Sequence, residues 1–413
     1  MRIAYLCKRH YMNHDVIADR YARLYEQPRQ LALLGHDVLG LCLSYRRTDE
    51  RNEVHEAGSG HLRWVGLAPG SLLPVGIAAY PKRALAELRE FAPDVLVAAS
   101  DAPHIVLGAW LAQRLGLPFA ADIYDHFESF GLARLPGVIP LYRRALRNAA
   151  VVSCVSQPLA NLVCAEYGAR GEVLALPSTI DRSIFFPRHQ RQCRQRLGLP
   201  LEARLIGTAG GLSREKGIAP LYEAFTALAQ DDAQLHLVLA GSLDKNCMPP
   251  PHPRVRYLGQ LPHTQTAELF SALDVGVVYV RNTPYGIYSF PQKALEMAAC
   301  GLALAVARVG AMETMFANTP QALYDADDAI ALAACLRHQL NSPARSTLKI
   351  MDWAEQAEVL SASYAKAVRG IKSTDVISAD CREIIPSRPE NPACAFPETP
   401  APLPAIPQCH RTG

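Results

Sequence analysis

The chain has 413 residues, of which 49% are apolar and 20% charged, and its formal net charge is +3. This composition excludes a chain that is disordered throughout, and so small a charge argues against nucleic acid as the main partner. The length predicts two to three domains. Eleven scattered cysteines form no Cys-x-x-Cys pair, which is typical of reduced thiols rather than of disulfides or a zinc site. We see no signal peptide and no bilayer-spanning apolar stretch, and we therefore expect a cytoplasmic protein.

Short apolar runs alternate with helical patterns along the chain, which predicts parallel sheets with crossover helices. In the first half, strands are predicted at 2–7, 37–43, 61–67, 94–99, 119–123, 151–155 and 173–176, with helices at 17–34, 81–91, 105–115 and 158–167. In the second half, strands are predicted at 205–208, 235–240, 256–258, 275–280, 303–307 and 322–324, with helices at 218–229, 264–272, 292–299 and 328–339.

Two such series predict an α/β fold with two Rossmann-like, doubly wound domains that face a central cleft. Turn-forming residues in segment 178–187 indicate a linker between an N-terminal domain, 1–177, and a C-terminal domain, 188–347. A last helix is expected over 348–370 and could return to the first domain. The proline-rich tail, 371–413, is expected to be disordered.

The first candidate site is Gly210-Gly-Leu-Ser-Arg-Glu-Lys-Gly217, which follows a predicted strand and precedes a helix. Gly210 and Gly211 would let the backbone approach a phosphate, while Arg214 and Lys216 would supply cations. The pattern thus favours a diphosphate site. An ordinary strand-turn-helix with a solvated charged loop explains the same residues about equally well.

The second candidate site begins the predicted helix 292–299. Ser289 suits its N-cap and Pro291 its first turn, and Lys293 and Glu296 would share one face. A carboxylate there could accept both hydroxyls of a ribose, with the lysine near a phosphate. Taken alone, an exposed ion pair is the more probable interpretation. The functional interpretation gains weight because both candidates follow strands of the same half.

Several short motifs run in order across residues 1–345: Leu34-Gly-His-Asp-Val38, Asp122-Ile-Tyr-Asp125, Val155-Ser156, Leu176-Pro177, Asp181, Phe186-Pro187, Leu212 to Gly217, Leu239-Ala-Gly241, Tyr257-Leu-Gly-Gln-Leu-Pro262, Ala272-Leu-Asp-Val275 and Pro291 to Gly301. In number, order and spacing, they resemble the retaining glycosyltransferases of family 4, which have the GT-B fold. The resemblance implies a nucleoside diphosphate sugar as donor, a saccharide or lipid-linked acceptor, and retention at the anomeric carbon, with no metal or other cofactor required.

The resemblance also implies roles for individual residues. Lys216 would contact the donor diphosphate, Glu296 would hold the ribose, and the loop at Gly259–Leu261 would lie near the base. With the motifs, it predicts that the donor is bound by Gly210, Gly211, Arg214, Lys216, Gly259, Leu261, Tyr288, Ser289, Phe290, Pro291, Lys293 and Glu296. Besides Lys216, we predict catalytic roles for Asp125 and His126, which could orient or deprotonate the acceptor hydroxyl. A strand-end cap and a half-buried histidine are equally good interpretations of that pair.

The sequence departs from the family pattern at several positions. Many members have an arginine where Gly211 stands, and Tyr288 replaces the first of two glutamates, which holds the donor sugar. The first-domain His-Asp pattern reads Tyr124-Asp125 here. The segment Cys7–His14 replaces a glycine-rich loop. Weak activity, unusual specificity and a lost reaction are all compatible with these changes.

We expect the acceptor to lie on the first domain, which contains a basic segment. Arg134, Arg143, Arg144 and Arg147 lie among apolar residues, without acidic ones between them. They could rest on an anionic membrane, or bind a lipid-linked or phosphorylated saccharide; a helix with solvated cations is the simpler alternative. Two other functions remain open: a nucleotide-sugar epimerase or hydrolase with the same fold, and a catalytically weakened nucleotide-sugar-binding protein.

Overall fold

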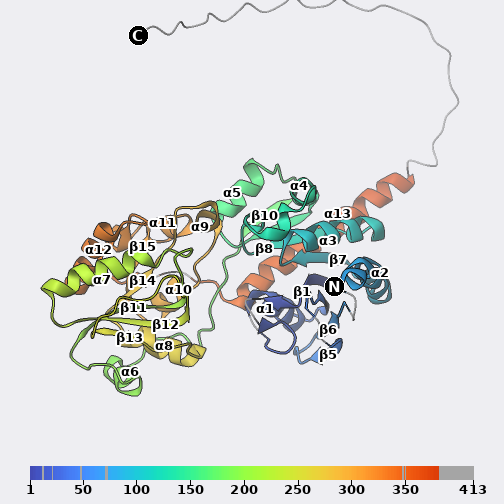
Figure 1. The fold of residues 1–413 in the computed structure, drawn as a ribbon. Coiled ribbons are helices and arrows are strands. Elements are labelled where there is room, and N and C mark those ends of the chain that lie inside the picture. Colours follow the sequence, from blue (N-terminus) through green and yellow to red (C-terminus); the bar gives the residue numbers. More distant parts are fainter. Residues whose placement is uncertain are drawn as a thin grey trace, which may run out of the picture. The chain divides into compact units, whose positions relative to one another are not determined.

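The computed structural model describes residues 1–380 except 12–13, 21, 47–48, 70–72, 347 and 349. Within these residues, the first sheet has the strand order β10-β9-β8-β7-β1-β4-β6-β5 (Figure 1). Its strands are β1 (Arg2–Lys8), β4 (Asp37–Leu43), β5 (Arg51–His55), β6 (His61–Leu67), β7 (Val95–Ala99), β8 (Phe119–Ile123), β9 (Val151–Cys154) and β10 (Glu172–Ala175). All adjacent strands are parallel except β5 and β6.

Crossover helices connect the parallel strands of this first lobe, and a hairpin follows β1. The helices are α1 (Ala22–Leu33), α2 (Leu73–Phe91), α3 (Ala102–Leu115), α4 (Val138–Asn148) and α5 (Gln157–Ala165), with short 3-10 turns η1 (Phe127–Ser129) and η2 (Gly131–Arg134). The hairpin pairs β2 (His10–Tyr11) with β3 (His14–Asp15). Helix α1 begins later than the predicted residue 17, because the Asp15 carboxylate accepts the N–H groups of Ile17 and Ala18 in a turn.

The second sheet is wholly parallel, with the order β13-β12-β11-β14-β15-β16. Its strands are β11 (Arg204–Leu212), β12 (Leu235–Leu243), β13 (Val255–Tyr257), β14 (Val275–Val278), β15 (Ala303–Ala307) and β16 (Leu323–Tyr324). Its helices are α6 (Gln190–Arg196), α7 (Ala219–Asp231), α8 (His263–Ala272), α9 (Pro284–Tyr288), α10 (Lys293–Ala299), α11 (Ala311–Met315) and α12 (Ala329–Asn341), with the 3-10 turn η3 (Pro320–Ala322).

Both faces of the second sheet are buried, as parallel sheets require. Side chains of β12 alternate between two cores, with Val238 on the side of α6, α8 and α10, and Leu237 on the side of α7 and α12. The prediction of two doubly wound, Rossmann-like domains is thus confirmed. In such a sheet, ligands bind at the carboxyl ends of the strands, where the strand order reverses. The reversal falls between β11 and β14 in the second sheet, and between β1 and β7 in the first.

Local capping chemistry fixes several helix ends. Asp101, Ser156 and Asp328 each accept a backbone N–H in the first turn of α3, α5 and α12. Gly116 ends α3 with φ 67°, a conformation that glycine adopts without strain.

Helix α13 (Trp353–Asp380) packs on the first lobe, where the hydroxyl groups of Tyr364 and Tyr5 are 3.4 Å apart. The helix continues past the predicted end at residue 370 into the predicted tail. The tail beyond residue 380 lies outside the described residues. The lobes also touch directly: the Ser156 Oγ donates to the Tyr288 carbonyl at 2.7 Å.

Candidate active site

The centre of the candidate site lies where β11 and β14 reach their carboxyl ends. Gly210 and Gly211 are near the end of β11, and Tyr279 directly follows β14. Two lysines cover the glycines. A Cβ atom at position 211 would lie 2.7 Å from Lys216 Nζ, and one at position 210 would lie 3.9 Å from Lys293 Nζ. The structure therefore brings together four of the residues that we predicted from the two motifs.

The two lysines repel each other. Burial lowers the pKa of Lys293 to about 7, the positive charge of Lys216 acts in the same direction, and Glu296 opposes both. The Lys293 ammonium lies 3.8 Å from the centre of the Tyr279 ring, which attracts a cation through its face. Two cations held beside a surface without side chains form a site for an anion.

Tyr279 is a part of this site that the sequence did not indicate. It is buried, and its hydroxyl donates to the Gly211 carbonyl at 2.8 Å. The Tyr279 side chain thus holds the glycine segment through its hydroxyl and contacts the Lys293 ammonium through its ring. A tyrosine at the end of an apolar strand is usually part of the core. Only the hydrogen bond to Gly211 shows that Tyr279 also belongs to the candidate site.

Glu296 lies one turn after Lys293 on α10, on the same face. Burial raises the pKa of its carboxyl group to about 7, although Lys293 acts against this shift. Gln292 Nε2 donates to its Oε1 at 3.3 Å. Gln292 also lines a cavity of about 470 Å³, whose other walls come from α1, segment 179–185 and the start of α13.

The loop after β13 provides an open glycine surface. The Gly259 carbonyl accepts the Gly241 N–H at 2.7 Å, and its φ of 74° is one that glycine favours. A Cβ atom at this position would meet nothing within 4 Å. Leu261, by contrast, packs against the core on the side of α8.

Three residues predicted to bind the donor, Ser289, Phe290 and Pro291, have other roles in the structure, and the prediction that Ser289 caps the helix was wrong. Gln292, not Ser289, precedes α10; the Ser289 Oγ donates to the Gly286 carbonyl and its N–H to Tyr285. Pro291 has no N–H to offer a phosphate. Neither Ser289 nor Pro291 therefore has a backbone N–H that could bind an anion. Phe290 packs against core residues of both lobes.

Two further predicted residues point elsewhere. Arg214 is exposed, and its charge acts on the Cys247 thiol, which lies on the loop after β12. The Tyr288 ring packs against the first lobe, with its centre 4.9 Å from that of His126. The position of the missing first glutamate is thus used for a contact between the lobes.

A cavity of about 690 Å³ adjoins this site. Its lining includes the carboxyl-end residues Lys8, Ser100 and Asp125 of the first sheet, and Lys216 and Tyr285 of the second lobe. Tyrosine and phenylalanine rings form much of its remaining wall, and such rings provide apolar faces with polar edges. The cavity therefore connects the lysine site with the first lobe.

Asp125 and His126, which we considered as one pair, have different surroundings. Burial raises the pKa of Asp125 to about 7, against the charges of Lys8 and Lys216. Its carboxylate accepts the His126 N–H, and the residue lines the cavity. His126 turns away from it: its Nδ1 lies 2.7 Å from Ser129 Oγ. The geometry favours Asp125 as the residue that meets an acceptor.

The four arginines of the basic segment divide into two groups. Arg143 forms two hydrogen bonds of 2.7 Å with Glu128, and Arg147 donates to the Tyr167 carbonyl. Arg134 and Arg144 are exposed. Only the second pair is therefore available to a partner.

Within the described residues, no three His, Cys, Asp or Glu side chains gather in a way that could hold a metal ion. No helix in the same part of the chain combines the length and the apolar character that a membrane span needs.

Comparison with known families matches both lobes. The model of the glycosyl transferase 4-like domain matches residues 22–179, and that of glycosyl transferases group 1 matches residues 203–342. The chain belongs to the group 1 glycosyltransferases. The resemblance seen in the sequence is thus confirmed, and this glycosyltransferase uses a nucleotide sugar.

Relatives of this glycosyltransferase support the same assignment. It is 24% identical to the putative teichuronic acid biosynthesis glycosyltransferase TuaC of Bacillus subtilis, over 75% of this chain and 82% of that protein. It is 28% identical to D-inositol 3-phosphate glycosyltransferase 1 of Catenulispora acidiphila, over 68% and 77%. Among solved structures, sucrose-phosphate synthase of Thermosynechococcus elongatus has 19% identity, a TM-score of 0.64 and coverage of 93% and 98%. Anabaena HepE in complex with UDP has 15% identity, a TM-score of 0.62 and coverage of 92% and 100%.

Proposed function

We propose that this glycosyltransferase binds the diphosphate of its donor between Lys216 and Lys293, over Gly210 and Gly211. The observation that carries the proposal is the pair of ammonium groups beside a surface without side chains. The low pKa of Lys293 supports it: burial, and then the charge of Lys216, disfavour the charged form of Lys293, and a diphosphate bound between the two lysines would favour it. We assign the neutralisation of the diphosphate to these lysines rather than to a metal ion.

The nucleoside part of the donor would lie toward Glu296. A carboxylate can accept hydrogen bonds from both ribose hydroxyls, and ionisation of this buried group would strengthen them. The cavity beside Gln292 and the open surface at Gly259 leave room for a base. The solved HepE complex with UDP supports a nucleoside diphosphate as the ligand class.

In the transfer step, the bond between the anomeric carbon and the diphosphate oxygen breaks, and the acceptor oxygen bonds to the same carbon. The diphosphate leaves with the bonding electron pair, and the two lysines stabilise this charge by a few kcal/mol per group. Asp125 accepts the proton of the acceptor hydroxyl, for which a pKa of about 7 is well suited. We propose that the acceptor is a saccharide in the 690 Å³ cavity and that transfer retains the anomeric configuration.

A membrane contact of the first lobe is a separate part of the proposal. Leu135 and Leu141 are half-exposed beside the exposed Arg134 and Arg144. Such a surface fits an anionic bilayer, at about 1 kcal/mol per cation. Flotation with anionic and with neutral vesicles tests it: the wild type should float only with the anionic ones, and Arg134→Gln with Arg144→Gln should not. Absence of flotation at low salt removes this part.

The donor site is tested by thermal shift with a panel of nucleoside diphosphates. A ligand at 100 times its Kd adds about 2.7 kcal/mol to the free energy of unfolding. Lys216→Ala should lose most of this shift and most of the turnover, whereas Lys366→Ala, on α13, should keep both. An unchanged shift in Lys216→Ala contradicts the diphosphate assignment. The anomeric signals of the product in an NMR spectrum decide retention.

A further inference from the structure

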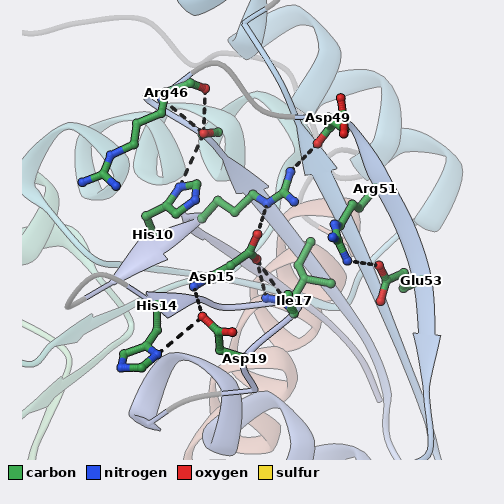
Figure 2. A network of polar contacts seen from close by, with 12 residues as sticks. His10, His14, Asp15, Ile17, Asp19, Arg46, Asp49, Arg51 and Glu53 are labelled. Atoms are coloured by element: carbon green, nitrogen blue, oxygen red, sulfur yellow. Dashed lines mark hydrogen bonds and ion pairs between the residues drawn. The ribbon is translucent and has the colours of Figure 1, made fainter. Parts of the chain in front are cut away.

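The segment after β1, where the family often has a glycine-rich loop, contains the hairpin β2–β3 in this protein. Arg9 is 2% exposed and anchors it, with Nε donating to Asp15 at 2.8 Å and Nη1 to the Asp49 carbonyl at 2.5 Å (Figure 2). The Arg9 N–H donates to the Leu43 carbonyl, which ties the hairpin to β4. The flanking residues Lys8 and His10 are thereby held at the cavity.

The cations around this hairpin fall into two groups. Arg9 pairs with Asp15 at 2.8 Å, and Arg51 pairs with Glu53 at 2.8 Å. Figure 2 shows the second of these pairs. The Arg46 guanidinium lies on the side of His10, and only its backbone groups take part in the hydrogen bonds drawn there. Within the described residues, neither Lys8 nor Arg46 forms an ion pair with a carboxylate, and both line the cavity.

The Asp101 carboxylate, which also lines the cavity, already accepts hydrogen bonds from other polar groups. Asp101 accepts the His104 N–H at 2.9 Å and the Tyr45 hydroxyl at 3.0 Å, and its Oδ1 is 2.8 Å from His104 Nδ1. This carboxylate is fixed in the wall and cannot turn toward a lysine or arginine. The charge of Lys8 acts on Asp101 and on Asp125, but within the described residues Lys8 forms no ion pair with either carboxylate. Its ammonium and the Arg46 guanidinium therefore remain able to donate hydrogen bonds to a ligand.

We propose that Lys8, His10 and Arg46 form an anion subsite that binds a phosphate or carboxylate group of the acceptor. The inference rests on the proposed function, which assigns the donor diphosphate to Lys216 and Lys293. Two cations, Lys8 and Arg46, lie on the other lobe of the same cavity and fit a second anion, to which the His10 ring can add a hydrogen bond. The acceptor is therefore an anionic saccharide, oriented by its charged group so that a hydroxyl reaches Asp125.

The subsite is distinct from the exposed Arg134 and Arg144 of the proposed membrane surface. Those two arginines do not line the cavity, whereas Lys8, His10 and Arg46 do. A guanidinium can hold a phosphate or carboxylate through two parallel hydrogen bonds, and the ammonium adds a third. Removing one such charged contact typically weakens binding by about tenfold or more.

The test compares three probes: glucose 6-phosphate, glucuronate and glucose. Their affinities are measured by ligand-observed NMR at constant ionic strength, with the donor site saturated by the nucleoside diphosphate chosen in the thermal-shift panel. Wild-type protein should bind one or both anionic probes at least about tenfold more tightly than glucose. The stronger of the two identifies phosphate or carboxylate as the recognised group.

Variants locate the effect. Arg46→Gln, and Arg46→Gln with His10→Gln, should lower the preference for the anionic probe toward that for glucose, with nucleoside diphosphate affinity unchanged. Arg46 is exposed, so its replacement should leave folding intact. Arg89→Gln, on α2, removes the same charge outside the cavity and should change nothing. Equal binding of all three probes by the wild type, or a preference that survives in both variants, overturns the inference. If no nucleoside diphosphate binds, the proposal for the donor site fails instead. The affinities of the three probes are then measured without nucleotide, and they still test the anion subsite.

Discussion

The low pKa of Lys293 makes donor affinity depend on pH in a direction that follows from the structure. Burial, and then the charge of Lys216, lower this pKa to about 7. A bound diphosphate favours the charged form and raises the pKa again. Above pH 7, binding must therefore take up a proton. The dissociation constant should then rise by up to about tenfold per pH unit.

Calorimetric titration with the nucleoside diphosphate between pH 6 and 9 measures this effect. At pH 6 most of the free protein has a charged Lys293; at pH 8 only about a tenth does, and Kd should be about tenfold weaker. Lys293→Met cannot take up the proton, so its binding should be weak throughout. The ratio of the variant's Kd to that of the wild type should fall as the pH rises. Lys366→Met should follow the wild type.

Glu296 titrates in the same range, because burial raises its pKa to about 7. Its ionisation strengthens the proposed ribose contact and so opposes the lysine effect in the wild type. Repeating the comparison in a Glu296→Gln background removes this second titration. If the Kd ratio of the two proteins is then the same at pH 6 and pH 9, Lys293 does not bind the diphosphate and our reasoning is refuted.

Three other predictions concern the same lobes. Tyr279→Phe removes the bond to Gly211 but keeps the ring under Lys293, so calorimetry should show donor binding weakened by about 1 kcal/mol with its pH dependence kept; no change in Kd would contradict this. Arg23→Met leaves the buried Asp122, now 2.6 Å from Arg23, without its partner, and urea unfolding should show a loss of about 3–5 kcal/mol. In Arg23→Met with Asp122→Asn, the loss should be smaller. Turnover should be the same with and without EDTA, because lysines neutralise the diphosphate; a loss restored by a divalent cation would show otherwise.

Apolar periodicity predicted the sheets well. The ranges predicted for β4, β6, β8 and β15 are those of the structure. Of these, β8 and β15 are buried at every residue and consist mainly of apolar residues, as strands covered on both faces do. Strand β5, Arg-Asn-Glu-Val-His, was missed because it is polar and pairs at the sheet edge. The hairpin β2–β3 and the short helices α9 and α11 are too brief for any period to show.

The site was predictable where neighbours in sequence carry it. Two local patterns indicated the donor-binding site: Gly210 and Gly211 shortly before Lys216, and Lys293 three residues before Glu296. The contribution of Tyr279 depends on a contact with Gly211, 68 residues earlier. The grouping of Lys8 with Arg46 likewise depends on β1 and β4 lying side by side. Contacts between residues so far apart in the sequence cannot be predicted from any local pattern.

The Ser156 hydroxyl has consequences for motion within the enzyme. Its oxygen accepts the Leu159 N–H at the start of α5, while its proton goes to the Tyr288 carbonyl. Separating α9 from α5 would break this part-buried hydrogen bond, at a net cost of about 0.5–1.5 kcal/mol. Product release that needs such a separation would therefore meet a small energetic threshold set by one hydroxyl proton.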